Sequence, residues 1–178
     1  NYIVEVDGKE NEVTDPYAKA VGVNGKRAMV IDLNETKQKN WNKDKKPKLD
    51  NATDAVIYEM HIRDFSIDDN SGITCKGKYN GVWEDKTTIP GTDVKTGVSH
   101  LKELGITLFG NGDIKTGVDH LKELGITHLH LLPTFDHRSI DETRLNEAQY
   151  NWGYDPQNYN VPEGSYSSDP YTAQVRIK

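Results

Sequence analysis

Residues 54–65 read DAVIYEMHIRDF, and this stretch decides the fold class. Successive side chains of a strand point to opposite faces. One face would carry Val56, Tyr58, Met60 and Ile62, and the other Ile57, Glu59, His61 and Arg63. A parallel barrel covers the outer face of each strand with a helix and can carry polar groups on the inner face near its mouth. The pattern therefore predicts the first strand of a (β/α)8 barrel, although a sheet with one face in solvent would give the same alternation.

A helix and a second strand are predicted further along the chain. Val118, Leu121 and Leu124 lie at helical spacing, and Gly125 is placed to end the helix. The short run HLHLL at 128–132 has the character of a strand and is closed by a proline. A strand, a helix and a strand in this order predict a parallel pair.

The predicted helix belongs to a repeated segment. Residues 93–107 recur as residues 113–127, with differences only at Val94/Ile114 and Ser99/Asp119. Two copies are too few for a solenoid, so we interpret them as a tandem duplication in which the second copy, joined to a proper strand, holds the native helix position. If the first copy held that position, amide exchange should protect residues 98–104 more strongly than 118–124. An engineered or artificially generated sequence would show the same repeat.

The first fifty residues have a different character. Residues 2–6 alternate as a strand, Asp7 and Gly8 form a turn signal, and AMVI at 28–31 predicts a second strand. A lysine-rich stretch then extends to Leu49 and is interpreted as a solvated linker. We therefore divide the chain into a β-rich remnant at 1–50 and an α/β domain at 51–178 that contains the repeat.

Composition limits the classes of partner. The 178 residues carry 28 acidic and 22 basic side chains, for a net charge of −6, so nucleic acid is a poor candidate partner. No apolar run approaches the length that spans a bilayer, and no signal peptide is recognisable, so neither a membrane nor a compartment is predicted. Cys75 is the single cysteine, which excludes an intrachain disulfide. The length is short for a complete barrel enzyme, and the chain begins without methionine, so we expect an excised or processed piece.

Aromatic residues concentrate near the end of the chain. Residues 150–156 read YNWGYDP, and six of the twelve Trp and Tyr residues fall within 149–178. Flat rings with a polar tip suit a ligand that presents both hydroxyl and C–H groups, as a sugar does. Gly153 would allow a tight turn between two rings. A small core that packs an irregular loop is the alternative reading.

Two further groups of residues could take part in metal binding or catalysis. His128 and His130 are two apart on a predicted strand, so both rings face one side and could begin a metal site, with His61, Asp136 or His137 as a third ligand. We favour the alternative that they are structural histidines in a half-buried strand. Carboxylates in or just after predicted strands could serve a glycosidase, which needs two at a defined separation. They are Glu59, Asp64, Asp136 and Asp155.

Four motifs resemble one family. DPYAKAV at 15–21, DAVIYEMHIRDFS at 54–66, GITHLHLLP at 125–133 and YNWGYDP at 150–156 are similar to type I pullulanases, debranching enzymes of the α-amylase superfamily. Their order and spacing match over almost the whole chain, apart from the inserted repeat.

The resemblance implies a fold and a function. Residues before about Asp50 would be the tail of a β-sandwich carbohydrate-binding type of module, and Asp54 would open an incomplete (β/α)8 barrel. The parent enzyme would hydrolyse α-1,6-glucosidic linkages of pullulan and branched α-glucans with retention, without a cofactor, although a calcium ion is compatible with it. Tyr154 would stack on the glucose being cleaved, Asp155 would bind its hydroxyls, and Trp152 would support the loop.

The resemblance also implies what this chain lacks. The family's nucleophile, acid/base and stabilising acid come from later strands, so no residue here matches a catalytic position and no metal ligand is assigned. We therefore expect an inactive chain whose open strand edges favour self-association. Three alternatives stay open: a non-catalytic α-glucan-binding module, a metal-dependent hydrolase built on His128 and His130, and a duplication without a function of its own.

Overall fold

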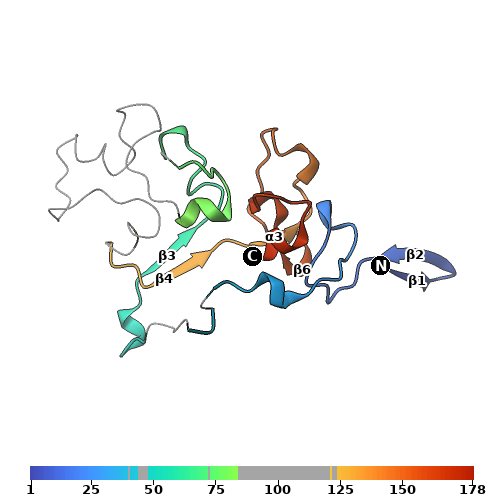
Figure 1. Cartoon of the computed structure of the whole chain (residues 1–178), viewed down its shortest axis with the longest axis horizontal. Coiled ribbons are helices and arrows are strands. Elements are labelled where there is room, and N and C mark those ends of the chain that lie inside the picture. The colour runs from blue at the N-terminus through green and yellow to red at the C-terminus, as the bar shows by residue number, and fades with distance from the viewer. Residues whose placement is uncertain (40, 44–47, 72, 84–120, 122–123) are drawn as a thin grey trace. The chain divides into compact units, whose positions relative to one another are not determined.

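A computed structural model describes residues 1–39, 41–43, 48–71, 73–83, 121 and 124–178. The chain divides into two compact units (Figure 1). Unit 1 consists of Asn1–Lys45 and Leu132–Lys178, and unit 2 consists of Lys46–Leu131. The first repeat copy and most of the second lie outside the described residues, so the interpretation of the duplication stays a prediction.

Unit 2 is built on a parallel pair of strands. Strand β3 (Ile57–Met60) pairs with β4 (His128–Leu131), with Ile57 opposite His128 and Met60 opposite Leu131 (Figure 1). The predicted parallel pair is therefore confirmed. Short 3-10 turns accompany it at Ala52–Asp54, Asp69–Ser71 and Tyr79–Trp83. The described strands form two-stranded sheets only, so the beginning of a barrel stays a proposal.

The segment that leads into β4 ends its helix as expected. Gly125 has φ +75°, and the amide of Ile126 donates to the carbonyl of Leu121 at 3.1 Å. This bond closes a helix end in which the left-handed residue is glycine. The position predicted for the helix stop is correct.

Unit 1 begins with a hairpin. Strand β1 (Tyr2–Val6) pairs antiparallel with β2 (Lys9–Val13), and Asp7 and Gly8 between them have φ +51° and +73°. Two positive φ values are typical of the turn whose twist matches the flanking strands. The turn was predicted correctly, but the second strand was placed wrongly at 28–31, where Ala28 makes only an isolated bridge to Val21. A two-residue turn returns the chain directly, so the polar residues KENEV pair in spite of their composition.

The remainder of unit 1 surrounds a second antiparallel pair. Strand β5 (Phe135–His137) pairs irregularly with β6 (Pro156–Pro162). The short helix α3 (Ala173–Ile177) follows, and 3-10 turns lie at Val23–Gly25, Leu33–Thr36, Trp41–Lys43, Glu142–Arg144 and Gly164–Tyr166. The apolar core of unit 1 is small and contains Ala20, Val21, Ile140, Val161, Tyr166 and Ala173. No helix in the described part of the chain is both long and apolar enough to cross a bilayer.

Candidate functional site

The aromatic segment 150–156 turns tightly against Pro133. Gly153 has φ +91°, and a Cβ atom placed there would lie 2.5 Å from the carbonyl oxygen of Pro133. The backbone therefore approaches Pro133 at a position that only glycine can occupy without strain. On either side of this turn, Trp152 is 60% exposed and Tyr154 is 67% exposed. In unit 1 these two rings face outward and do not form a core.

Asp155 is half-buried and held from two sides. One carboxylate oxygen, Oδ2, accepts a hydrogen bond from the Ser139 hydroxyl, and the other, Oδ1, accepts one from the Asn151 amide at 2.6 Å. Its carbonyl oxygen accepts from the backbone amide of Arg138 at 3.1 Å. Burial raises the pKa of Asp155, but the hydrogen bonds from Ser139 and Asn151 outweigh it and hold the pKa below the ordinary value. The group is therefore an ionised acceptor at neutral pH.

This combination of side chains suits a polyhydroxylated ligand. Exposed rings can stack on the C–H face of a pyranose, and a fixed carboxylate can accept bonds from its hydroxyls. Trp152, Tyr154 and Asp155 are brought together by their adjacency in the chain. Their role in sugar binding stays a prediction.

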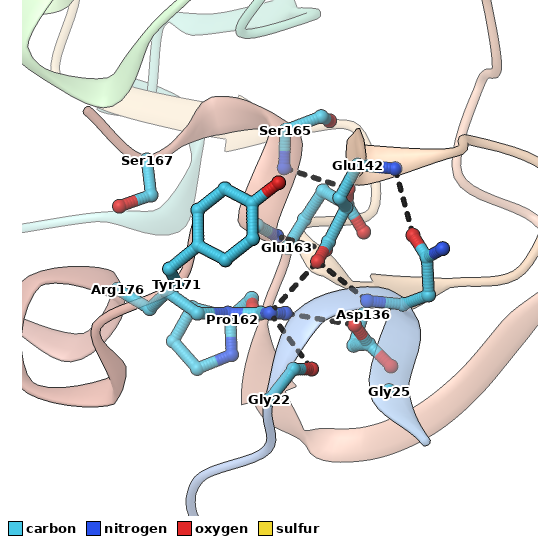
Figure 2. A network of polar contacts seen from close by, with 12 residues as sticks. Gly22, Gly25, Asp136, Glu142, Pro162, Glu163, Ser165, Ser167, Tyr171 and Arg176 are labelled. Carbon is cyan, nitrogen blue, oxygen red and sulfur yellow. Dashed lines mark hydrogen bonds and ion pairs between the residues drawn. The ribbon is translucent and has the colours of Figure 1, made fainter. Parts of the chain in front are cut away.

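A buried ion network forms a second feature of unit 1 (Figure 2). The guanidinium of Arg176 donates to Asp136 Oδ1 at 2.8 Å and to Glu142 Oε2 at 3.0 Å. It also donates to the backbone carbonyls of Pro162 and Gly22, at 3.0 and 3.3 Å. All three charged side chains are almost completely buried. Because buried charges are costly without partners, the network must form as a whole.

Glu163 is a third buried carboxylate in this network (Figure 2). It accepts from the backbone amides of His137 at 2.8 Å and Ser165 at 2.9 Å, and the His137 ring nitrogen Nδ1 lies 3.6 Å from its Oε2. Burial raises the pKa of Glu163, and it also raises the pKa of Glu142. The neighbouring negative charges act in the same direction for both groups.

Among the described residues, these acids are also the one group with the geometry of a metal site. Oxygen atoms of Asp136, Glu142 and Glu163 lie within 4.8 Å of one another. Two of the three acids already bind the guanidinium of Arg176, which supplies a cation. We therefore assign the network a structural role.

Most of this network was not foreseen from the sequence. Asp136 was singled out as a carboxylate after a strand, but Glu142, Glu163 and Arg176 were not. They come from a turn, the residue directly after β6 and helix α3, and no periodic pattern connects them. No sequence signal we know of would have grouped them.

The histidine pair does not assemble a metal site in the described part of unit 2. His128 and His130 lie two apart on β4, and both are exposed. The ring nitrogen Nδ1 of His130 is 3.1 Å from Glu59 Oε2, its register partner on β3. Neither histidine belongs to a group of three ligand atoms within the described residues. His130 therefore has a cross-strand carboxylate partner, and the described residues give no support to a metal-dependent hydrolase.

Comparison with known proteins gives a consistent result. No protein-family model matches the chain. The chain is 42% identical over 166 residues to a pullulanase of Bacillus subtilis (strain 168), covering 93% of this chain and 19% of that protein. It is 32% identical over 195 residues to the chloroplastic pullulanase 1 of Arabidopsis thaliana, covering 92% of this chain and 18% of that protein.

A solved structure agrees with these sequence relatives. The crystal structure of a pullulanase from Paenibacillus barengoltzii, in complex with maltohexaose and α-cyclodextrin, matches with a TM-score of 0.79 and 49% identity. The match covers 98% of this chain and 24% of that one. The chain thus spans between about a fifth and a quarter of the length of the relatives it matches.

Proposed function

We propose that this chain, which is homologous along nearly its whole length to a segment of the type I pullulanases, is part of a glycoside hydrolase that cleaves α-1,6-glucosidic linkages. The substrates would be pullulan and branched α-glucans, and cleavage would proceed with retention, as the family resemblance implies. The observation that carries the proposal is the similarity in sequence and in structure, which extends over 93% and 98% of the chain.

The proposed contact with substrate is the aromatic segment. Tyr154 would stack on one glucose unit, Asp155 would accept bonds from its hydroxyls, and Trp152 would support the loop. Two observations support this assignment: both rings are exposed, and the carboxylate is ionised and fixed by hydrogen bonds. The Paenibacillus barengoltzii enzyme was crystallised with maltohexaose and α-cyclodextrin, which makes an α-glucan the natural ligand class.

The proposed architecture also follows from the similarity to pullulanases. Residues 51–178 would provide the first strands and helices of a (β/α)8 barrel, and residues 1–50 would belong to the preceding β-sandwich module. The parallel pair β3–β4 supports the first part of this proposal, because parallel strands joined through a helix are the unit from which such barrels are built. The open edges of these two strands would allow self-association of the isolated chain.

Sugar binding is tested by titrating the chain with maltotriose and observing tryptophan fluorescence and amide chemical shifts. We expect saturable shifts at Trp152, Tyr154 and Asp155. We expect Tyr154→Ala to weaken maltotriose binding by about tenfold, since an aromatic–sugar contact accounts for on the order of 1 kcal/mol. The matched control is Tyr171→Ala, because Tyr171 is equally exposed and lies outside the segment. Absence of saturable shifts in the unsubstituted chain would count against the assignment.

Catalysis is tested separately. Because no residue of this chain matches a catalytic position of the family, we expect no release of reducing sugar from pullulan above a blank. A complete relative assayed alongside supplies the positive control. Hydrolysis of pullulan by the purified 178-residue chain would contradict this prediction, because it would require a pair of catalytic acids that the family resemblance does not assign to this chain.

A further inference from the structure

We propose that Ser139 and Asn151 are positioning residues, which hold the Asp155 carboxylate in one orientation and leave its other acceptor positions to sugar hydroxyls. The inference rests on the proposed function, because it concerns how the same segment would present its acid to a glucan. It assigns a role to two residues that the sequence motifs left without one.

The hydrogen bonds fix Asp155 from opposite ends of its carboxylate. Ser139 donates to Oδ2 and Asn151 donates to Oδ1, so each oxygen has a side-chain donor. An ionised carboxylate has about four acceptor positions, and besides these two donors this one interacts with its own backbone amide, so part of its capacity remains for a ligand. The backbone of Asp155 is tied to the same place, since the amide of Arg138 donates to its carbonyl oxygen. Rotation of the carboxylate would break at least one of these bonds.

Asn151 also connects the acid to the aromatic turn. Its Nδ2 donates to Asp155, while its Oδ1 accepts from the backbone amide of Gly153 at 2.8 Å. Gly153 is the residue at which the chain turns between the rings of Trp152 and Tyr154. One amide side chain thus sets the carboxylate and the turn together, which is the preorganisation that a binding site requires.

The charge state of Asp155 agrees with this arrangement. Burial acts to raise its pKa, but donors on both oxygens lower it, and the neighbouring His137 on β5 contributes in the same lowering direction. Donors to the ionised form stabilise that form. The geometry therefore favours the ionised form of Asp155, which accepts hydrogen bonds.

The first experiment measures the pKa of Asp155 from its side-chain carbonyl shift as a function of pH. We expect a pKa below 3.8 in the unsubstituted chain, a rise towards that value in Ser139→Ala, and recovery in Ser139→Thr, which restores the hydroxyl. Asn151→Asp should raise the pKa further, because it removes a donor and adds a like charge while keeping an acceptor for Gly153. Ser168→Ala, at an exposed serine outside the network, is the control. An ordinary pKa in the unsubstituted chain, or no change in Ser139→Ala and Asn151→Asp, would overturn the inference.

The second experiment repeats the maltotriose titration with the same variants. Ser139→Ala and Asn151→Asp should each weaken binding by about tenfold, comparable to one hydrogen bond to a charged group, whereas Ser139→Thr should bind normally. Unchanged binding in the two weakening variants would contradict positioning. If the unsubstituted chain does not bind maltotriose, the proposed function fails, and the pKa measurement still decides whether the two residues hold the acid.

Discussion

At the scale of single residues, Gly153 determines how the aromatic segment meets the rest of unit 1. Its φ of +91° is in the region that favours glycine, and the carbonyl of Pro133 occupies the space beside its Cα atom. Both the backbone conformation and the close approach therefore require that no side chain be present.

We predict that Gly153→Ala destabilises unit 1 by about 1–3 kcal/mol, since the variant must adopt a strained backbone or move away from Pro133. Gly22→Ala is the matched control, because Gly22 has φ −76° and open space around its Cα atom. The comparison is made by urea denaturation. Equal midpoints for the two variants would show that the contact with Pro133 does not constrain the turn.

Arg176 has an equally specific role in the buried network. It is the cation between Asp136 and Glu142, and it is 3% exposed. Its removal would leave buried carboxylates without compensation, a change that typically costs several kcal/mol.

We predict that Arg176→Met lowers the free energy of unfolding of unit 1 by about 3–5 kcal/mol at neutral pH. Arg144→Met provides the contrast, because Arg144 also pairs with two carboxylates, those of Asp141 and Glu147, but is 58% exposed. Exposed pairs contribute less than about 1 kcal/mol. Urea denaturation of the two variants side by side measures the difference, and similar losses would argue against a buried ionic hub.

At the scale of elements, turns and composition each account for only part of the strand pairing. The polar run KENEV forms β2 because the Asp7–Gly8 turn returns the chain onto β1. The more apolar run at 28–31 also follows two residues with positive φ, Asn24 at +58° and Gly25 at +63°, yet it makes one isolated bridge. In unit 2 the alternation at 57–60 and the run at 128–131 sufficed, and the two strands pair in parallel.

The repeat gives a prediction at the same scale. Deleting residues 93–112 removes one repeat unit and leaves a single copy joined to β4. Because the helix end at Gly125 leads directly into that strand, we expect the β3–β4 pair to keep its amide chemical shifts and exchange protection. Deleting 113–132, which removes the same length together with β4, serves as the control and should abolish the pair. Loss of the pair in both deletions would contradict the assignment of the native position to the second copy.

At the scale of the whole of unit 1, the buried network joins segments that are distant in the chain. The side-chain oxygen of Asn24 accepts from the backbone amide of Glu142 at 2.7 Å, and the backbone amide of Asn24 donates to the Glu142 carboxylate at 2.8 Å, across 118 positions. Arg176 reaches Gly22 across 154 positions. These bonds explain why the first 45 residues and the last segment form one compact unit.

The charge of the network predicts how stability depends on pH. Burial raises the pKa of both Glu142 and Glu163 above the ordinary value of 4.5. A group whose pKa is raised on folding contributes stability that is complete below its unfolded pKa and is lost as the pH rises through its folded pKa. We therefore expect unit 1 to become less stable as the pH increases from about 4.5 towards neutrality.

Glu142→Gln tests this expectation, since it removes one of the two titrating groups and should flatten the dependence. The control is Glu147→Gln, because Glu147 is exposed. Urea midpoints are measured across that pH range. Asp155 and Asp169 act in the opposite direction, because their lowered pKa values make their contribution disappear only below about pH 3.8. A stability that rises towards neutral pH in the unsubstituted chain would contradict the buried-acid account.

Parts of the fold could be predicted because their signals are local. The Asp7–Gly8 turn, the alternation in β3, the short run of β4 and the helix stop at Gly125 each depend on a few neighbouring residues. The motif YNWGYDP likewise identified an exposed aromatic segment with an acid. In each case the physical cause, a backbone conformation or a side-chain period, is contained within the stretch itself.

The sequence by itself therefore determined the homology to pullulanases and the parallel pair, and it supplied the prediction that Trp152, Tyr154 and Asp155 contact a sugar. Tertiary structure alone decided that Ser139 and Asn151 hold Asp155, and that Arg176 neutralises acids from two other segments. The periodicity of a sequence predicts which face of an element is apolar. The partners of a buried polar group depend instead on which groups lie within hydrogen-bonding distance once the group is removed from water. Those partners lie as many as 154 positions apart, and only the folded chain brings them together.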